Sequence, residues 1–252
     1  ELKPNFYIIN NSKVFWKVKK KFKNNKVKIL NEFNFKKNKL RKSDITIAAI
    51  PGIAGLKPTI ELVKSSKKIL IANKESVICG WDLIKKNALK FRTKLIPVDS
   101  EHFSIMKLLE NQNKKDIKKI YLTASGGPFL NYKLSKMKKI RPAEAIKHPK
   151  WKMGKKISID SSTMMNKVFE VIEAKKLFNL KYKDISILTH PKSYVHAIVK
   201  FKNGLTKILI HDTNMKIPIF NSLFFNKSSK NFPAKLNISK LNHLNLSPIN
   251  VK

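Results

Sequence analysis

The sequence predicts an α/β protein whose first half forms a parallel sheet and whose second half forms a small mixed or antiparallel sheet. Two observations carry this prediction. Between residues 44 and 123, short runs rich in β-branched residues alternate with longer segments of helical periodicity. Between residues 184 and 211, three such runs follow one another closely, and Asn203-Gly204 lies between the last two as a hairpin signal.

The first hundred residues supply the predicted parallel sheet. Residues 44–50 form a buried strand by their β-branched run, and Gly52 and Gly55 follow in a turn. The other elements expected here are strands at 7–9, 27–30, 67–72 and 94–98 and helices at 14–22, 56–66 and 75–89. A helix between successive strands is what parallel pairing requires.

After residue 128 the predicted pattern changes. The alternation of strands and helices gives way to one helix followed by several strands. A helix at 101–110 and a strand at 119–123, ended by Gly126-Gly127-Pro128, complete the alternating part. A helix at 163–178 then precedes strands at 184–189, 196–201 and 206–211. Beyond residue 225 the chain is polar and weakly periodic, so residues 226–252 are expected to form a linker or extended arm.

Composition bounds the possible functions. The chain has 252 residues, 42% of them hydrophobic, which is enough for a sizeable core and excludes a mostly disordered protein. The formal net charge of +38 suggests a basic nucleic-acid-binding module. However, the three arginines are Arg41, Arg92 and Arg141, and base-edge readout favours arginine over the lysines that supply this charge. Compositional drift is the better explanation, and the nucleic-acid-binding module is the alternative.

The single cysteine excludes a disulfide scaffold. Cys79 has no partner for an intrachain disulfide, and it lies among apolar residues of a predicted helix, so we expect it in the core. The longest nearly apolar run, residues 45–56, is too short to span a bilayer.

Two carboxylates after the strand at 94–98 suggest a metal site. Asp99 and Glu101 stand at i and i+2, and on extended backbone such side chains point to the same side. Open α/β sheets bind ligands at the carboxyl ends of their strands, and paired carboxylates suit Mg²⁺ or Mn²⁺. The alternative is a helix N-cap, in which Asp99 or Ser100 caps the next helix and Glu101 favours its dipole.

A second polar group lies between residues 160 and 173. The DSST run at 160–163 is expected to start a helix, whose free N–H groups and hydroxyls would bind an anion. Further along, Asn166, Glu170 and Glu173 stand at i, i+4 and i+7 on one helix face, beside Lys167. The alternative is a solvated helix face with a Lys–Glu pair.

Two loops at strand ends are further candidates. Residues 123–128 carry Ser125 and two glycines after a strand, and such a loop can cradle a phosphate with its hydroxyl and amides. The alternative is a plain strand-ending turn. Residues 73–76 follow the strand at 67–72, and their alternative is a strand-to-helix turn with charged caps.

A third loop suggests a lid. Residues 148–154 contain His148 and Trp151 ahead of a strand-like segment, and they fit either a mobile lid or a surface loop anchored by its tryptophan. Of the other histidines, His102 and His196 show no metal-ligand spacing, so we expect packing or surface roles for them.

Taken together, these segments resemble one family, the 1-deoxy-D-xylulose 5-phosphate reductoisomerases of the non-mevalonate isoprenoid pathway. The matching stretches run in the family's order from residue 48 to about residue 199, and they include six of the seven glycines. They read AAIPGIAGLKPT, IANKESVICG, PVDSEH, LTASGGPF, HPKWKMGKKISIDSSTMMNK, EVIEA and HPKSYVHAIV.

The resemblance implies a reaction and residues that perform it. The reaction is the NADPH-dependent and divalent-metal-dependent rearrangement and reduction of 1-deoxy-D-xylulose 5-phosphate to 2-C-methyl-D-erythritol 4-phosphate. The metal ligands, for Mn²⁺ or Mg²⁺, would be Asp99, Glu101 and Glu170. The substrate phosphate would be bound by Ser125, Ser161, Asn166 and Lys167. The rest of the substrate would meet Lys74, Ser100 and His148, under a lid carrying Trp151. The NADPH side would be lined by Asn73, Glu75 and Gly154.

The resemblance also implies the domain organisation. Residues 1–98 would form a partial Rossmann-type NADPH-binding domain, residues 99–225 an α+β catalytic domain, and residues 226–252 a linker toward a C-terminal helical domain. The family's N-terminal glycine-rich loop and that helical domain are expected to lie outside this sequence. A homodimer is implied, in the cytoplasm of a bacterium or in a plastid of a eukaryote, with no nucleic-acid or membrane partner.

Two positions depart from the family pattern. Val168 stands where the family usually has glycine, beside Lys167, and Pro51 changes the first glycine turn. We expect close packing near Val168 to shift. An inactive remnant of the enzyme is therefore a further alternative, which the complete sets of metal-ligand and phosphate-binding residues oppose.

Overall fold

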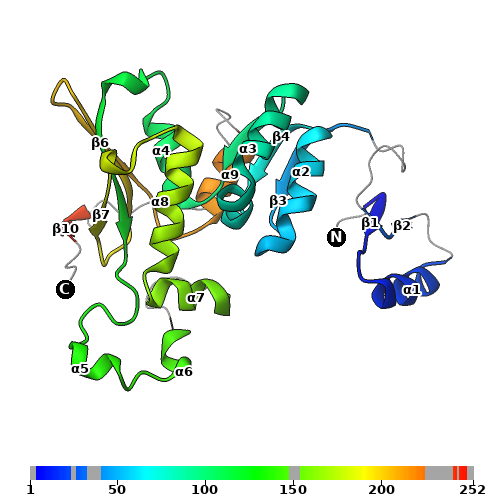
Figure 1. Cartoon of the computed structure of the whole chain (residues 1–252), viewed down its shortest axis with the longest axis horizontal. Coiled ribbons are helices and arrows are strands. Elements are labelled where there is room, and N and C mark those ends of the chain that lie inside the picture. Colours follow the sequence, from blue (N-terminus) through cyan, green and yellow to red (C-terminus); the bar gives the residue numbers. More distant parts are fainter. Residues whose placement is uncertain are drawn as a thin grey trace.

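The strands of this chain form sheets of two, three and five strands. The computed structural model describes residues 4–23, 27–32, 41–147, 154–224, 241–242 and 244–248. Figure 1 shows the two-stranded sheet at one end of the molecule and the five-stranded sheet at the other, with the three-stranded sheet between them. The predicted α/β class, with a parallel sheet in the first half and a mixed sheet in the second, is confirmed.

The two-stranded sheet is formed by the first elements of the chain. Its strands pair in parallel around one helix, and these elements are β1 (Phe6–Ile8), α1 (Ser12–Lys21) and β2 (Lys28–Leu30). The helix begins where the Asn11 side chain accepts a hydrogen bond from the Val14 amide, 3.0 Å away. All three elements lie within a residue or two of their predicted positions.

The three-stranded sheet is parallel and follows the predicted alternation. Its strands are β3 (Ser43–Ala48), β4 (Ser66–Ile71) and β5 (Lys94–Pro97), in that spatial order. The turn η1 (Ile53–Gly55) and the helices α2 (Leu56–Lys64) and α3 (Lys74–Phe91) connect them. Their apolar side chains form one buried cluster, which includes Val63, Ile69, Ile71, Val77 and Ile84. Burial of this apolar surface stabilises the packing of both helices.

The expected core position of the cysteine is wrong. Cys79 is exposed on α3, whereas Val77 and Ile84 are fully buried. Each helical residue turns the side chain by about 100°, so Cys79, two residues after Val77, points to nearly the opposite side of the helix.

The five-stranded sheet is mixed, in the order β10-β7-β6-β8-β9. Its strands are β6 (Ile117–Ala124), β7 (Ile185–Thr189), β8 (Val195–Phe201), β9 (Thr206–Ile210) and β10 (Ser247–Pro248). β6 pairs in parallel with β7, and the other pairs are antiparallel. The predicted hairpin joins β8 and β9, and Gly204 takes a φ of 89° between them, a conformation that suits glycine.

Two helices connect this sheet to the rest of the molecule. α4 (Ser100–Leu108) and α8 (Met165–Phe178) lie between the five-stranded sheet and α3 (Figure 1). Ile105 of α4 and Ala174 and Phe178 of α8 are buried against Leu122 and Ala197 of the sheet. The polar side chains of both helices therefore meet near the ends of β5 and β6.

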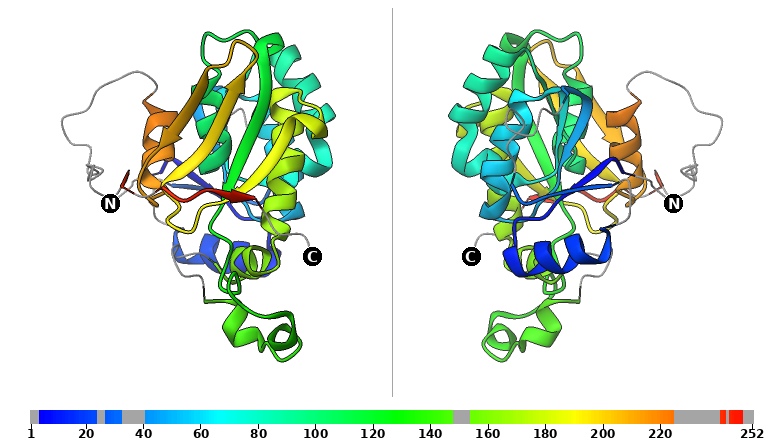
Figure 2. Two further views of the ribbon diagram at one scale, coloured as in Figure 1. Left: turned by 90° about the vertical axis from the view of Figure 1, so that its left-hand side faces the viewer. Right: turned by 90° about the vertical axis from the view of Figure 1, so that its right-hand side faces the viewer.

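The remaining helices are short. They are α5 (Leu134–Met137), α6 (Pro142–Ala145), α7 (Lys155–Ser162) and α9 (Lys216–Leu223), with single turns η2 (Lys114–Asp116) and η3 (Tyr182–Asp184). Figure 2 shows α5 and α6, in green, projecting away from the sheets. No helix among the described residues has both the length and the apolar character needed to cross a membrane.

Two predictions around residue 160 are wrong. The strand-like segment after Gly154 is the helix α7, and the run at 160–163 ends that helix instead of starting one. Two hydroxyls of this run donate back to a carbonyl oxygen of the same helix, Ser162 to Ile159 over 2.8 Å and Thr163 to Ile159 over 3.2 Å. Serine and threonine often cap helix N-termini, but they also make such back-bonds, and local sequence does not separate the two uses.

The division at residues 98 and 225 stays a prediction, and most of the expected linker at 226–252 lies outside the described residues.

The shift in packing expected at Val168 is not needed. Its side chain is 44% exposed on α8, so its β-branch points toward solvent and needs no new space in the core.

Candidate functional site

A cavity of about 240 Å³ lies where the parallel and mixed sheets meet. Most of the predicted site residues line it, although they come from four separate segments of the chain. They are Lys74, Asp99, Ser100, Glu101, Ser125, Ser161, Asn166, Lys167 and Glu170. These residues meet because β4, β5 and β6 each end at this cavity. The residues just after each strand end project into it.

Three carboxylates converge in the cavity. One oxygen from each of Asp99, Glu101 and Glu170 lies within 4.8 Å of the others. Asp99 is also the N-cap of α4, because its side chain accepts a hydrogen bond from the Glu101 amide over 3.3 Å. The metal-site and N-cap interpretations therefore both hold: the cap fixes Asp99 at the start of the helix whose first turn carries Glu101.

Two buried lysines pair with these three carboxylates. Lys74 Nζ lies 3.0 Å from Asp99 Oδ2, 2.8 Å from Asn166 Oδ1 and 3.4 Å from Glu170 Oε1. Lys167 Nζ lies 2.7 Å from Glu101 Oε1 and also contacts the other oxygen of Glu170 and the main-chain oxygen of Thr123. Burial alone would lower the pKa of Lys74, but Asp99 and Glu170 raise it well above its ordinary value.

The charges in the cavity fit a hard divalent cation. Burial and the neighbouring Glu170 carboxylate raise the pKa of Glu101 to about 7, although Lys167 opposes this. Burial would also raise the pKa of Asp99, but the ammonium of Lys74 and the ring of His102 hold it well below its usual range. Crowded carboxylate oxygens with this excess of negative charge are the donor set that Mg²⁺ or Mn²⁺ prefers.

The serines of the candidate phosphate site are brought together by a glycine. Gly127, in the loop after β6, has a φ of 69°, and a Cβ added there would lie 2.8 Å from the main-chain oxygen of Ser161. Glycine thus lets the end of α7 approach the loop that carries Ser125, whose hydroxyl accepts a hydrogen bond from the Gly127 amide. Two hydroxyls therefore face one cavity, even though the predicted helix start is a helix end.

The residues expected on the NADPH side lie beside the cavity. Asn73 is 3% exposed, and its side chain accepts from the Ser76 amide and donates to the main-chain oxygens of Ile50 and Gly52. Its hydrogen bonds thus hold the glycine turn and the start of α3. Glu75 follows in the first turn of α3 and pairs with Lys156 of α7 over 2.6 Å.

Three other predicted residues lie away from these contacts. Gly154 is exposed at the N-terminus of α7. His148 and Trp151, the proposed substrate contact and lid residue, lie outside the described residues.

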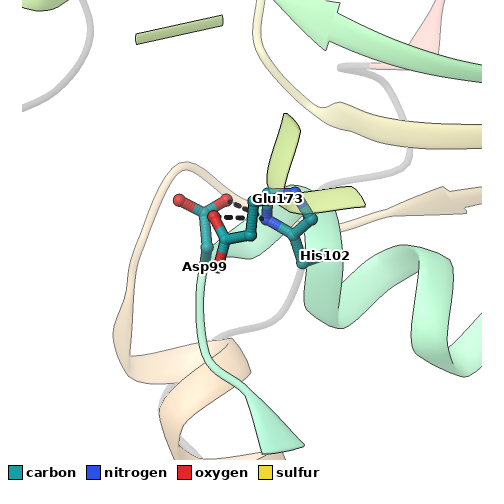
Figure 3. A group of neighbouring side chains, drawn as sticks. All are labelled: Asp99, His102 and Glu173. Carbon is teal, nitrogen blue, oxygen red and sulfur yellow. Dashed lines mark ion pairs between the residues drawn. The ribbon is translucent and has the colours of Figure 1, made fainter. Parts of the chain in front are cut away.

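Sequence reasoning missed several polar residues. Ser193 and His196 line the cavity, and His196 stacks on His211 with ring centroids 3.7 Å apart. Behind the cavity, His102 is buried against Asp99 and against Glu173, which the spacing in the sequence already places on the helix face of Glu170 (Figure 3). Spacing offered one signal: Glu173 stands at i+7 from Asn166 on the same helix face as Glu170, and His102 stands three residues after Asp99.

The fold and cavity together define a class of protein. An α/β fold with three convergent carboxylates, two buried lysines and a serine-glycine loop is typical of a metal-dependent enzyme for a phosphorylated substrate. Comparison with known families gives the particular one. The family model described as 1-deoxy-D-xylulose 5-phosphate reductoisomerase matches residues 1–80, and that of its C-terminal domain matches residues 95–178. The chain belongs to the 1-deoxy-D-xylulose 5-phosphate reductoisomerase family.

Similar proteins carry the same description. The Pelagibacter ubique reductoisomerase is 58% identical over 234 residues, which are 91% of this chain and 60% of that protein. The Clostridium novyi reductoisomerase is 41% identical over 245 residues, which are 96% of this chain and 64% of that protein. The chain thus spans about 60% of the length of these relatives.

Solved structures of the family share the fold. The Zymomonas mobilis reductoisomerase in complex with NADPH matches 97% of this chain and 64% of its own, with a TM-score of 0.86 and 32% identity. A reductoisomerase in complex with NADPH, fosmidomycin and magnesium matches 98% of this chain and 64% of its own, with a TM-score of 0.87 and 33% identity.

Proposed function

We propose that this protein catalyses the NADPH-dependent rearrangement and reduction of 1-deoxy-D-xylulose 5-phosphate to 2-C-methyl-D-erythritol 4-phosphate. Membership of the reductoisomerase family implies this reaction. The observation that carries it to this chain is the convergence of Asp99, Glu101 and Glu170 within 4.8 Å in a cavity that also holds Lys74 and Lys167. An inactive remnant would have no reason to keep this expensive buried arrangement.

The three carboxylates would hold Mg²⁺ or Mn²⁺. When bound, the cation would supply a Lewis acid beside the substrate oxygens. The solved relatives described as complexes with NADPH and magnesium support this pair of cofactors. In this chain, oxygen donors from α4 and α8 are already within reach of one another, so little rearrangement of the main chain would be needed.

The cavity would orient the substrate at two ends. Ser125, Ser161, Asn166 and Lys167 would bind the phosphate, because hydroxyl, amide and ammonium donors from the β6 loop, α7 and α8 meet there. Lys74 and Ser100 would contact the carbon backbone beside the carboxylates, together with His148 under the segment that carries Trp151. Asn73, Glu75 and Gly154 would form the NADPH side, Asn73 by shaping the turn after β3.

We also propose a homodimer. The mixed sheet ends in the edge strand β9. Leu205, just before this strand, is 61% exposed, and Ile208 within it is 45% exposed. Exposed apolar side chains on a sheet edge suit pairing with a second copy.

Turnover tests the proposed reaction. The protein expressed from the intact gene is mixed with 1-deoxy-D-xylulose 5-phosphate, NADPH and Mn²⁺, and NADPH consumption is followed by absorbance. We expect turnover that a chelator abolishes and that Asp99→Asn reduces by at least about a hundredfold, since a metal ligand is lost. Metal-independent turnover, or none, would refute the proposal.

Mn²⁺ binding tests the metal site separately. Electron paramagnetic resonance of this 252-residue chain should show Mn²⁺ binding that weakens in Asp99→Asn. Equal binding by both proteins would place the metal elsewhere.

A further inference from the structure

A buried histidine links two of the proposed metal ligands from behind. His102 is fully buried, and Figure 3 shows the carboxylates of Asp99 and Glu173 on the same side of its ring, both paired with it. Its Nδ1 lies 3.3 Å from Asp99 Oδ1 and 3.4 Å from Glu173 Oε2. Its Nε2 lies 2.8 Å from the main-chain oxygen of Glu170. Neither His102 nor Glu173 lines the cavity. Both therefore act on it through the residues in front of them, Asp99 and Glu170.

The ring has a defined neighbour at each nitrogen. A carbonyl oxygen can only accept a hydrogen bond, so Nε2 must carry a proton to bond with Glu170. Nδ1 faces one carboxylate oxygen of Asp99 and one of Glu173 at ion-pair distance. The ring therefore lies between the start of α4 and the middle of α8.

The ring joins two elements that carry the proposed metal ligands. On one side is Asp99, the N-cap of α4, whose other carboxylate oxygen is held by Lys74. On the other side is the main chain of α8 at Glu170. Glu173 follows Glu170 by about one turn of the same helix, so its carboxylate reaches Nδ1 while the Glu170 carbonyl accepts from Nε2.

We propose that Glu173 is a positioning residue for the metal site: its carboxylate orients the His102 ring, and His102 fixes the Asp99 carboxylate and the main chain of Glu170 in their ligand positions. The inference rests on the proposed function, because it concerns the same metal. Residues behind metal ligands commonly set ligand orientation, and their loss weakens metal binding by about tenfold or more.

A double-mutant cycle on Mn²⁺ affinity tests the role of Glu173. Mn²⁺ binding to the 252-residue chain is titrated by electron paramagnetic resonance for the parent, Glu173→Gln, His102→Gln and the double variant. Glutamine at position 102 keeps a donor for the Glu170 carbonyl but removes the ring nitrogen that faces Asp99 and Glu173. We expect one Mn²⁺ per parent chain, about tenfold weaker binding in Glu173→Gln, and no further loss when Glu173→Gln is added to His102→Gln.

The matched control is Glu110→Gln. Glu110 is a carboxylate near the end of α4 that pairs with Lys107 over 2.9 Å and is 38% exposed, so the same chemical change there should leave Mn²⁺ affinity within about twofold. Circular dichroism checks that each variant is folded. If Glu173→Gln does not fold, Glu173→Asp replaces it: the charge stays but the carboxylate is withdrawn by one methylene, and we expect binding weakened by about threefold.

The outcomes separate this inference from the proposed function. Parent-like Mn²⁺ affinity in Glu173→Gln, or in a substituted Glu173→Asp, overturns the positioning role. Losses that multiply in the double variant also overturn it, because Glu173 would then act by its charge independently of His102. A second Mn²⁺ that disappears in Glu173→Gln would make Asp99, His102 and Glu173 a metal site in their own right. A parent chain that binds no Mn²⁺ refutes the metal site itself.

Discussion

Lys167 Nζ lies 2.7 Å from Glu101 Oε1, although the two residues are 66 positions apart in the chain. Their side chains are 6% and 15% exposed, so water screens the pair weakly. The contact joins α8 to the first turn of α4, and Lys167 also touches Glu170. The ammonium thus sits among the carboxylates proposed to bind a metal, and it stabilises the fold at the same place.

Replacing this lysine should destabilise the chain. In Lys167→Met, buried carboxylates lose their counter-ion, and we expect the free energy of unfolding to fall by about 3–5 kcal/mol without metal. Mn²⁺ should then stabilise the variant more than the parent, because the cation takes over the lost charge. Urea unfolding with and without Mn²⁺ measures both effects.

Lys64→Met is the matched control. Lys64 pairs with Glu61 at the same 2.7 Å, but the two side chains are 36% and 31% exposed. We expect a loss below about 1 kcal/mol and no dependence on Mn²⁺. Equal losses in the two variants would show that burial does not decide the strength of the Lys167 pair.

A methyl group at Gly127 should move the end of α7, which carries Ser161, away from the loop that carries Ser125. In Gly127→Ala, the new Cβ would meet the Ser161 oxygen at 2.8 Å on a backbone with a φ of 69°, so α7 must move away. We expect a loss of about 2–4 kcal/mol in stability and weaker binding of inorganic phosphate by calorimetry. Gly204→Ala has a similar φ of 89° but no atom within 4 Å. It should cost about 1–2 kcal/mol and leave phosphate binding unchanged.

Asn73 should contribute more to the free energy of unfolding than a simple helix N-cap does. Asn73→Ala removes the acceptor of the Ser76 amide and leaves the main-chain oxygens of Ile50 and Gly52 without its amide. We expect the free energy of unfolding to fall by about 2–4 kcal/mol. Asn11→Ala removes an exposed cap that bonds Val14, and it should cost about 1 kcal/mol. Similar losses in chemical denaturation of the two variants would contradict the extra role of Asn73.

The stacked pair His196 and His211 should make the fold sensitive to acid. Burial, then the neighbouring ring, lowers the pKa of His196 well below 6.5, and burial lowers that of His211. Below pH 6.5 these two histidines therefore bind more protons in the unfolded chain than in the folded one. The stability of the neutral pair is complete above that pH and is lost as pH falls toward the folded pKa values.

His211→Phe isolates this effect. It keeps an aromatic ring against His196 but removes one titrating group, so between pH 6.5 and 5 its stability should fall less steeply than that of the parent, by up to about 1.4 kcal/mol per pH unit. The test compares the variant with the parent, because Glu101 and Glu173 also change the stability of both proteins with pH. Their pKa values are raised to about 7, so their contribution to stability grows as pH falls. Identical slopes in urea unfolding would contradict the prediction.

The sequence by itself determined the order of elements and most of the candidate site. Hydrophobic periodicity is local, so it placed β3 to β6 and α2 to α4 within a few residues. Asp99 and Glu101 were identified because two carboxylates directly after a strand are chemically unusual. The family resemblance assigned roles to Lys74, Lys167 and the serines, whose types alone are common on surfaces.

The tertiary structure decided the rest. The run at 160–163 suits either end of a helix, and only packing of α7 against Gly127 fixes it as the end. His102 stands three residues after Asp99, but its other partners, Glu170 and Glu173, lie about 70 residues away on another helix. Long-range contacts of this kind arise when separate elements pack, and the spacing of residues along the chain does not encode them.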